Sequence, residues 1–177
     1  MKLGNILVMA GVGLTVAGCG ISPGDYFIYR VSPGTTEEED TCFYPDMGPP
    51  ADKADDLTTI RKSETWIIYA SVDNAFYLDN SQSTLEGVAT DTGYQFRGKK
   101  VDIQFELPDG MGTKRTTTDT YTVDVTVDGD AISGKSTGKT TYGCNGPSCG
   151  TEPIPTCTRT TEFVGTHVDE IQLNYDL

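Results

Sequence analysis

Five cysteines are the residues of this 177-residue sequence whose spacing most directly predicts chemistry. One of them, Cys19, directly follows a run of apolar and small residues near the amino terminus. The other four are Cys42, Cys144, Cys149 and Cys157. An even number of cysteines in the body of an exported chain is typical of disulfide bonds. The sequence therefore predicts two disulfides and a separate role for Cys19.

The pairing of the four cysteines follows only in part from their spacing. Cys144 and Cys149 enclose Asn-Gly-Pro-Ser, a turn-forming core that lets this short segment close on itself. Cys42 then pairs with Cys157 and ties an early segment to the late strands. A bond from Cys144 to Cys157 is the competing arrangement.

A structural zinc site is a further alternative for these thiols, with His167 as the fourth ligand. The C-x₄-C spacing fits such a site poorly, and an oxidising compartment opposes free thiolates. We therefore expect disulfides, with neither a metal ion nor another cofactor.

Residues 1–18 have the layout of an export signal. A single positive residue, Lys2, precedes an apolar run from Ile6 to Ala17. Such a run is too short to span a bilayer, which takes about 20 apolar residues. It ends in the small residues that typically precede a signal-peptide cleavage site.

The tetrad Val16-Ala17-Gly18-Cys19 resembles the lipobox of bacterial lipoproteins. The resemblance implies cleavage after Gly18, diacylglycerol on the Cys19 thiol, and a further fatty acid such as palmitate on the new amino group. Gly20 follows the anchor in place of an aspartate, which by the same resemblance favours the outer membrane. The expected location is the bacterial cell envelope, facing the periplasm or the exterior. The alternative is an ordinary signal peptide, with Cys19 in a disulfide.

Composition excludes one class of partner. The chain has 26 acidic and 13 basic residues, a formal net charge of −13, and removal of residues 1–18 takes away Lys2 and no acid. Nucleic acid requires clustered Lys and Arg, so no nucleic-acid partner is expected. An anionic lipid surface repels so acidic a body, and attachment to the membrane must therefore come from the lipid anchor.

The mature chain is expected to contain a short tether, residues 19–24, and a single domain, residues 25–177. Within that domain, a turn at Ser32-Pro33-Gly34 is expected to open a segment, residues 33–57, that is rich in proline and acidic residues. Such a segment buries little and should lie on the surface. Its acidic side chains could form a calcium loop, but a solvated connection is the more frequent outcome.

From residue 58 onward, alternation of apolar and polar residues predicts antiparallel strands. Residues 100–107 and 121–128 alternate cleanly, with a turn expected at Gly98-Lys99 and a hairpin at Asp128-Gly129. Residues 132–142 carry glycines on one face, which indicate close approach of another backbone. A last strand is expected at 171–177. About eight to ten strands in hairpin order predict an all-β, disulfide-stapled, antiparallel up-and-down β-barrel, with a β-sandwich as the alternative.

The strand count and hairpin order are similar to those of lipocalin-like, or calycin, barrels, although Trp66 follows Thr65 where that family has Gly-x-Trp. The resemblance implies a binding module for a small hydrophobic ligand, held in a cavity lined by aromatic side chains. A filled core is the favoured outcome and the cavity the alternative, since about eight strands leave little free space. The candidate lining residues are Tyr29, Trp66, Tyr94, Phe96, Phe105, Tyr121, Tyr142 and Phe163.

Catalysis finds little support in the sequence. His167 is the only imidazole, so a hydrolase triad would have to use it, with Ser133 or Ser136 as nucleophile. Neither serine lies in a Gly-x-Ser-x-Gly elbow. We therefore expect no catalytic residues and a non-catalytic structural or interaction role, with the membrane and an envelope protein as partners. Binding of a small hydrophobic ligand is the alternative, and an envelope hydrolase is the third.

Overall fold

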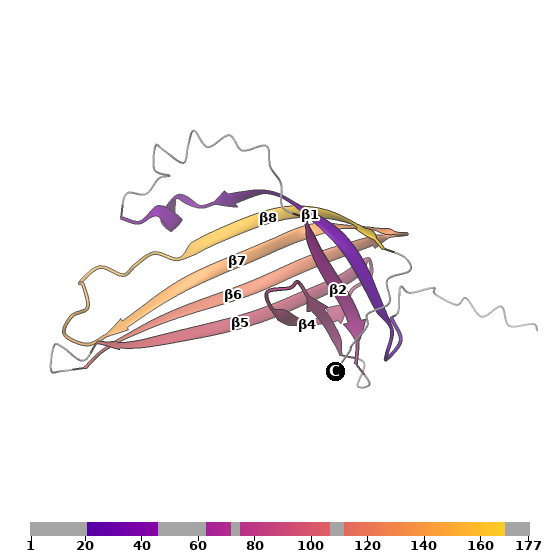
Figure 1. The fold of residues 1–177 in the computed structure, drawn as a ribbon. Helices are drawn as coiled ribbons and strands as arrows, with labels where there is room; N and C mark the ends of the chain where they lie inside the picture. The colour runs from indigo at the N-terminus through magenta and orange to yellow at the C-terminus, as the bar shows by residue number, and fades with distance from the viewer. Residues whose placement is uncertain (1–20, 46–62, 72–74, 107–111, 169–177) are drawn as a thin grey trace, which may run out of the picture.

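The computed structural model describes residues 21–45, 63–71, 75–106 and 112–168. They form an all-β fold in which eight antiparallel strands close into a barrel in chain order (Figure 1). Each strand pairs with the next and β1 pairs with β8, which confirms the predicted up-and-down barrel over the sandwich. The strands are β1 (Tyr26–Glu38), β2 (Glu64–Ala70), β3 (Phe76–Asp79), β4 (Thr84–Ala89), β5 (Gly93–Glu106), β6 (Thr113–Asp128), β7 (Ala131–Asn145) and β8 (Cys157–His167).

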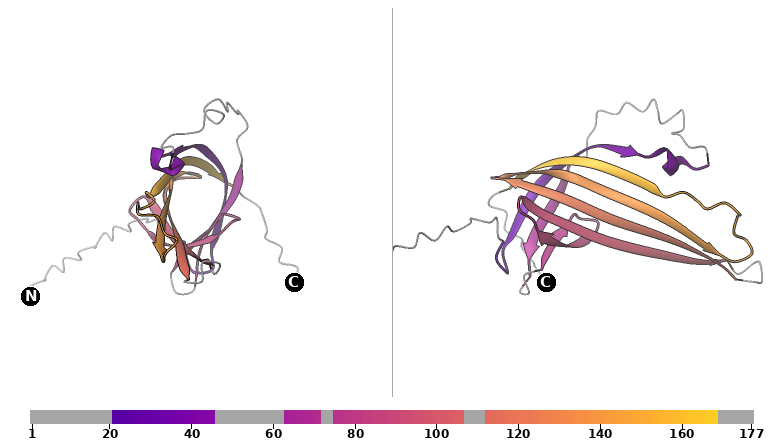
Figure 2. Two further views of the ribbon diagram at one scale, coloured as in Figure 1. Left: turned by 90° about the vertical axis from the view of Figure 1, so that its left-hand side faces the viewer. Right: turned by 180° about the vertical axis from the view of Figure 1, so that it is seen from behind.

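The strands differ greatly in length, and this difference sets the shape of the molecule. β3 and β4 have 4 and 6 residues, whereas β5 to β8 have 11 to 16. The ring of strands is visible end-on, and the long strands run on well past it (Figure 2). A short 3-10 helix, η1 (Asp40–Phe43), follows β1. No helix in the described part of the chain is long and apolar enough to cross a membrane.

The barrel encloses a packed apolar core. In β2, Trp66, Ile68 and Ala70 alternate inward and are at most 5% exposed. Phe96 of β5 and Leu78 of β3 are fully buried across from them. Burying one such large side chain stabilises the fold by about 1.5–3 kcal/mol. The core is therefore concentrated in the part of the molecule where the ring of strands is complete.

Ile21 belongs to this core, although residues 19–24 were predicted to be a tether. Its side chain is only 5% exposed. The backbone N–H of Gly24 donates to the carbonyl of Ala70, and Gly24 has a φ of +92°, which favours glycine. The chain is therefore fixed from Ile21 onward, at the barrel end where β1 begins.

Two predicted turns are continuous strand. β1 passes through Ser32-Pro33-Gly34 with a register shift between Pro33 and Thr36, where proline needs no ladder hydrogen bond. β5 passes through Gly98 without a break because this glycine serves packing: a Cβ there would collide with the Leu85 side chain. The predicted surface segment 33–57 therefore begins as strand and as η1, whereas its residues 46–57 and the predicted strand 171–177 lie outside the described residues.

The glycines of β7 allow a direct test of the barrel packing. A Cβ at Gly134 would meet the carbonyl oxygen of Asp124 and lie 2.7 Å from the Phe163 ring, whereas at Gly138 it would lie 3.6 Å from the Tyr121 ring. We expect Gly134→Ala to lower the free energy of unfolding by about 1–3 kcal/mol. Gly138→Ala, the matched control, should leave it nearly unchanged. Urea denaturation measures both, and equal values for the two variants would contradict this packing.

Candidate functional site

The four long strands continue beyond the barrel as a sheet that we call the arm. β4 stops pairing with β5 at Arg97, and β5 runs on for nine residues, about 25–30 Å. β6 stays paired with β5 and β7 along this length, whereas β8 pairs with β7 only as far as Cys157 opposite Thr140. The arm therefore has four strands at its base and three beyond it. The arm consists of Gly98–Glu106 of β5, Thr113–Tyr121 of β6, residues 138–145 of β7 and residues 157–159 of β8.

β5 forms an open edge of the arm. The backbone N–H of Val127 in β6 donates to the carbonyl of Thr92, and the N–H of Thr90, directly after β4, donates to the carbonyl of Gly93. Bonding sides alternate along an antiparallel strand, so even-numbered residues of β5 bond to β6 and odd-numbered ones face the β4 side. Among the described residues, no strand pairs with 98–106 on that side. The N–H and C=O groups of 99, 101, 103 and 105 therefore point to the open edge.

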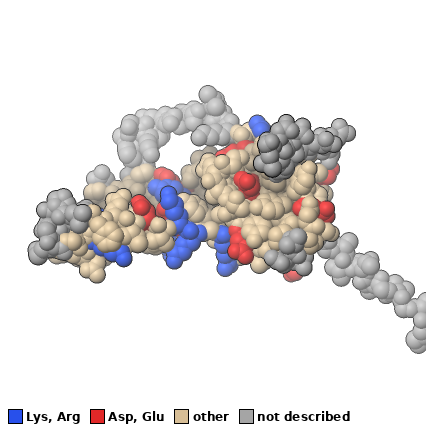
Figure 3. Space-filling model, turned by 60° about the horizontal axis from the view of Figure 1, so that its bottom comes forward, with Lys and Arg blue, Asp and Glu red and all other residues tan. Residues whose placement is uncertain are grey.

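A row of apolar side chains accompanies this edge. Phe96 points into the barrel, so the odd-numbered residues of β5 lie on the outer face of the sheet. Val101, Ile103 and Phe105 are 47%, 45% and 64% exposed. Lys99 and Lys100 precede the row, and lysine on an edge strand is a common guard against uncontrolled pairing. Figure 3 views the molecule from the β5 side and shows basic side chains gathered where the arm leaves the barrel, with acidic and basic groups farther along it.

An exposed strand edge next to apolar side chains is a template for pairing with another strand. The edge supplies unpaired backbone groups, and the side chains beside it supply apolar area that pairing buries. The chemistry that this combination supports is recognition of an extended polypeptide by strand addition.

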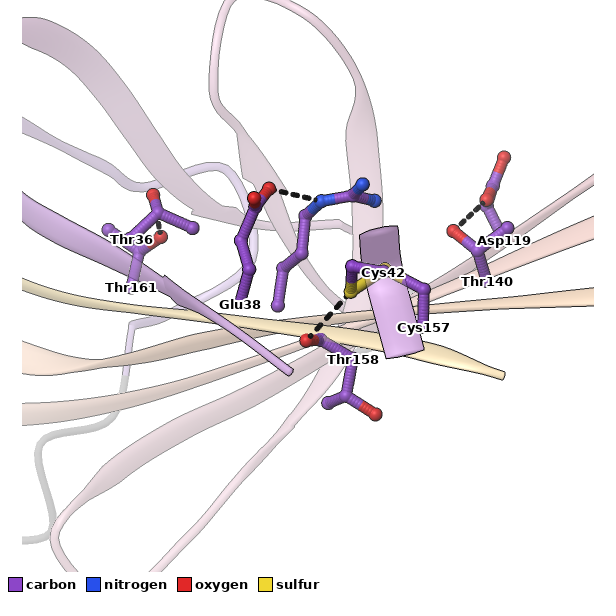
Figure 4. A network of polar contacts seen from close by, with 9 residues as sticks. Thr36, Glu38, Cys42, Asp119, Thr140, Cys157, Thr158 and Thr161 are labelled. Atoms are coloured by element: carbon purple, nitrogen blue, oxygen red, sulfur yellow. Dashed lines mark hydrogen bonds and ion pairs between the residues drawn. A yellow bond between two sulfur atoms is a disulfide. The ribbon is translucent and has the colours of Figure 1, made fainter. Parts of the chain in front are cut away.

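At the base of the arm, the opposite edge, along β8, is covered. β1 pairs with β8 as far as Glu38 opposite Arg159, and the Nε–H of Arg159 donates to Oε1 of Glu38 at 2.6 Å. Next to this pair, the disulfide between Cys42 and Cys157 fastens η1 to the start of β8 (Figure 4). The base of the arm is therefore bonded and stapled along β8, whereas no described strand pairs with the β5 edge beyond Arg97.

The inner face of the arm is polar. The hydroxyl of Thr140 donates to Oδ1 of Asp119 at 2.7 Å (Figure 4). The ring of Tyr121 lies beside Gly138, where an added Cβ would be 3.6 Å from it. These residues line a shallow hollow of about 280 Å³ that extends to Arg159. A second hollow, of about 380 Å³, lies near the tip beside the Cys144–Cys149 loop. Both are lined by mixed polar groups, unlike the apolar barrel core.

The structure pairs the cysteines as the sequence favoured. Cys42 bonds to Cys157 across 115 residues, and Cys144 bonds to Cys149 across 5. The zinc alternative needs three of these thiols free. Within the described ranges, no three His, Cys, Asp or Glu side chains come together as a metal site. Cys19 lies outside the described residues.

The eight aromatic residues expected to line one cavity fall into two groups. Five are buried in the barrel, where they pack on one another: the rings of Trp66 and Phe163 are 4.6 Å apart, and those of Tyr94 and Phe96 are 5.9 Å apart. The other three lie on the arm and are 43–64% exposed. The expectation of one shared cavity was wrong, because the arm carries its residues beyond the ring. The buried group is Tyr29, Trp66, Tyr94, Phe96 and Phe163, and the arm group is Phe105, Tyr121 and Tyr142.

His167 is not brought close to either candidate nucleophile. Its ring contacts those of Phe27 and Tyr29, at centroid distances of 5.4 and 5.5 Å. Ser136 pairs with Thr161, six residues along β8 from His167, or about 20 Å. Ser133 is exposed and pairs with Val164.

Sequence reasoning missed the open edge. Residues 100–107 show their alternation plainly, but alternation indicates only which face a side chain occupies. The available signal was a length mismatch between neighbours: β5 has 14 residues and β4 has 6. A strand that long cannot be matched along its whole length by so short a neighbour.

Comparison with known proteins found no counterpart. No protein-family model, curated protein or solved structure matches this chain. The functional argument therefore depends on the geometry of the chain itself.

The two disulfides should contribute unequally to stability. Loop-closure entropy predicts that replacing Cys42 and Cys157 with serine costs about 4–5 kcal/mol, because their bond closes a long loop, whereas replacing Cys144 and Cys149 costs about 2 kcal/mol. Urea denaturation of the two double variants measures the difference. Equal costs, or a larger cost for the short loop, would contradict a stapling role for the Cys42–Cys157 bond.

Proposed function

We propose that this protein is a lipid-anchored lipoprotein of the bacterial outer membrane with a non-catalytic interaction role, and that the arm is its interacting element. The lipobox tetrad ending in Cys19 supports the anchor. Ile21, two residues later, is buried in the barrel, so the body would sit close to the lipid. Acyl chains on Cys19 would supply the stable attachment that so acidic a chain lacks.

The arm and the anchor belong to opposite ends of the molecule. β1 starts beyond the end of β8, since Tyr29 already pairs with His167, and Glu38 pairs with Arg159 where the arm begins. Ile21 therefore lies at the barrel end away from the arm tip (Figure 1). A protein held by its amino terminus would keep the arm clear of the attachment point, where a partner can reach it.

The observation that carries the interaction role is the open β5 edge with its exposed apolar row. Ile103 at its centre is 45% exposed, and among the described residues no strand pairs with this edge. Monomeric proteins usually cover or interrupt such an edge. Strand addition by a partner would satisfy its backbone groups and bury its apolar side chains.

The alternative functions receive less support. A hydrophobic ligand would need the space that the five buried aromatic residues fill with ring-to-ring contacts. A hydrolase would need His167 within hydrogen-bond reach of a nucleophile, and the register keeps Ser133 and Ser136 away from it. No specific observation favours either function over interaction.

Replacement of the anchor residue tests the location. We expect Cys19→Ala, expressed as the full chain in a Gram-negative host, to lose palmitate labelling and to leave the outer-membrane fraction, because both would depend on the Cys19 thiol. Labelling with radioactive palmitate and density-gradient separation of membranes measure the two effects. A Cys19→Ala protein that keeps its label and its membrane fraction would contradict the anchor.

Position-specific crosslinking tests the interaction role. A photocrosslinking amino acid in place of Ile103 should give a defined crosslinked species in intact cells, because this position would lie in the interface. Val164 is the matched control, since it is an apolar residue on the barrel surface and 61% exposed. Equal crosslinking at both positions, or none at Ile103, would argue against the arm as the interacting element.

A further inference from the structure

We propose that the partner of the β5 edge is a second copy of this chain, paired antiparallel through residues 100–106 about a two-fold axis at Ile103. The inference deepens the proposed interaction role by naming the partner. It depends on the arm being the interacting element and not on the lipid anchor.

The length of the open edge limits the registers that a second copy can adopt. β4 ends its pairing at Arg97, and its Leu85 side chain contacts the edge at Gly98. A second β5 strand must therefore keep to the residues after Gly98. Pairing centred on Ile103 uses 100–106 in both copies and keeps each copy clear of the other's β4.

The backbone groups of this register match. Centring on Ile103 pairs Ile103 with itself and Val101 with Phe105 of the second copy. All three are odd-numbered residues, whose N–H and C=O groups face the open edge. The register therefore forms three hydrogen-bonded residue pairs, each of which exchanges two bonds.

The side chains of the outer face match as well. A two-fold axis perpendicular to the sheet keeps the outer faces of both copies on the same side. The exposed row of Val101, Ile103 and Phe105 then meets its own copy and becomes a continuous apolar patch of six side chains. Apolar cross-strand pairs of this kind stabilise antiparallel sheets.

The inner-face charges select this register over the neighbouring one. With the axis at Ile103, Asp102 lies across from Gln104 of the second copy. Within one chain, the side-chain amide of Gln104 makes only a long 3.4 Å bond to Asp102, so it can donate to the facing Asp102 instead. An axis at Asp102 would place two aspartates directly opposite each other, which is unfavourable.

The geometry of the pair is compatible with membrane anchoring. Antiparallel pairing puts the two barrels at opposite ends, where they do not collide. A two-fold rotation leaves the position of each atom along the axis unchanged. Ile21 therefore lies at the same level along this axis in both copies. Both amino termini can therefore reach one bilayer, and the interface closes as a dimer without open-ended growth.

A proline at the centre of the interface tests the proposal. The N–H of Ile103 faces the open edge, so Ile103→Pro removes no bond between β5 and β6 but blocks the two-fold pairing. We expect the full-length protein, purified in detergent, to sediment as a dimer. The Ile103→Pro variant should sediment as a monomer, with dimer affinity lowered at least about 100-fold.

Two further variants keep the test decisive. Circular dichroism shows whether Ile103→Pro folds. If it does not, Ile103→Lys takes its place in the test and should be a monomer. Val88→Lys, at an exposed apolar residue of β4 in the barrel, should remain dimeric. Analytical ultracentrifugation measures the oligomeric state of the wild type and of all three variants. A monomeric wild type, or dimers that persist in both Ile103 variants, would overturn the proposal.

Crosslinking separates failure of this inference from failure of the interaction role. Ile103→Cys should give a disulfide-linked dimer in membranes, because the register places the two residues 103 face to face, whereas Val88→Cys should not. If the photocrosslinker at Ile103 captures a different protein and never a second copy, the interaction role stands and the second copy is overturned. No crosslink of any kind would overturn both.

Discussion

The backbone hydrogen bonds of β5 are the constraint on which the rest of this structure depends. A strand must pair on both sides or leave its polar groups to water, and β5 pairs with β6 over its whole length but with β4 only as far as Arg97. The barrel is complete where all eight strands are present. Beyond that point the same ladder continues as an arm, so the open edge follows directly from the difference in strand length.

The two ends of the molecule are stabilised by different interactions. The barrel depends on apolar packing, with Phe96 and Ile68 fully buried and Gly134 allowing close approach of Asp124 and Phe163. Among the described residues, no second sheet packs against the arm, which depends on its hydrogen-bond ladder, the Cys42–Cys157 bond and the inner-face contacts of residues such as Asp119. Substitutions in the barrel should therefore act on stability, and substitutions along β5 should act on association.

Alternation in the sequence predicted the β-barrel, and spacing favoured the disulfides that the structure contains. Alternation placed Tyr121 and Tyr142 on the face that continues the core, yet both are exposed. A period of two gives the face of a side chain but not the length of the neighbouring strand. Ile21 was assigned to a tether because a single apolar residue between glycine and serine carries no alternation. Pairing partners and packing at these positions are set by tertiary structure.

Amide hydrogen exchange along β5 in the full-length protein, purified in detergent, tests most directly whether the open edge is occupied. Odd-numbered and even-numbered residues can be compared within one strand, since Val101, Ile103 and Phe105 direct their N–H groups away from β6, whereas Asp102 and Gln104 direct theirs toward it. The account predicts that these three amides exchange as slowly as those of Asp102 and Gln104. Fast exchange of the odd-numbered amides beside protected even-numbered ones would mean that the edge is open to water, and would contradict it.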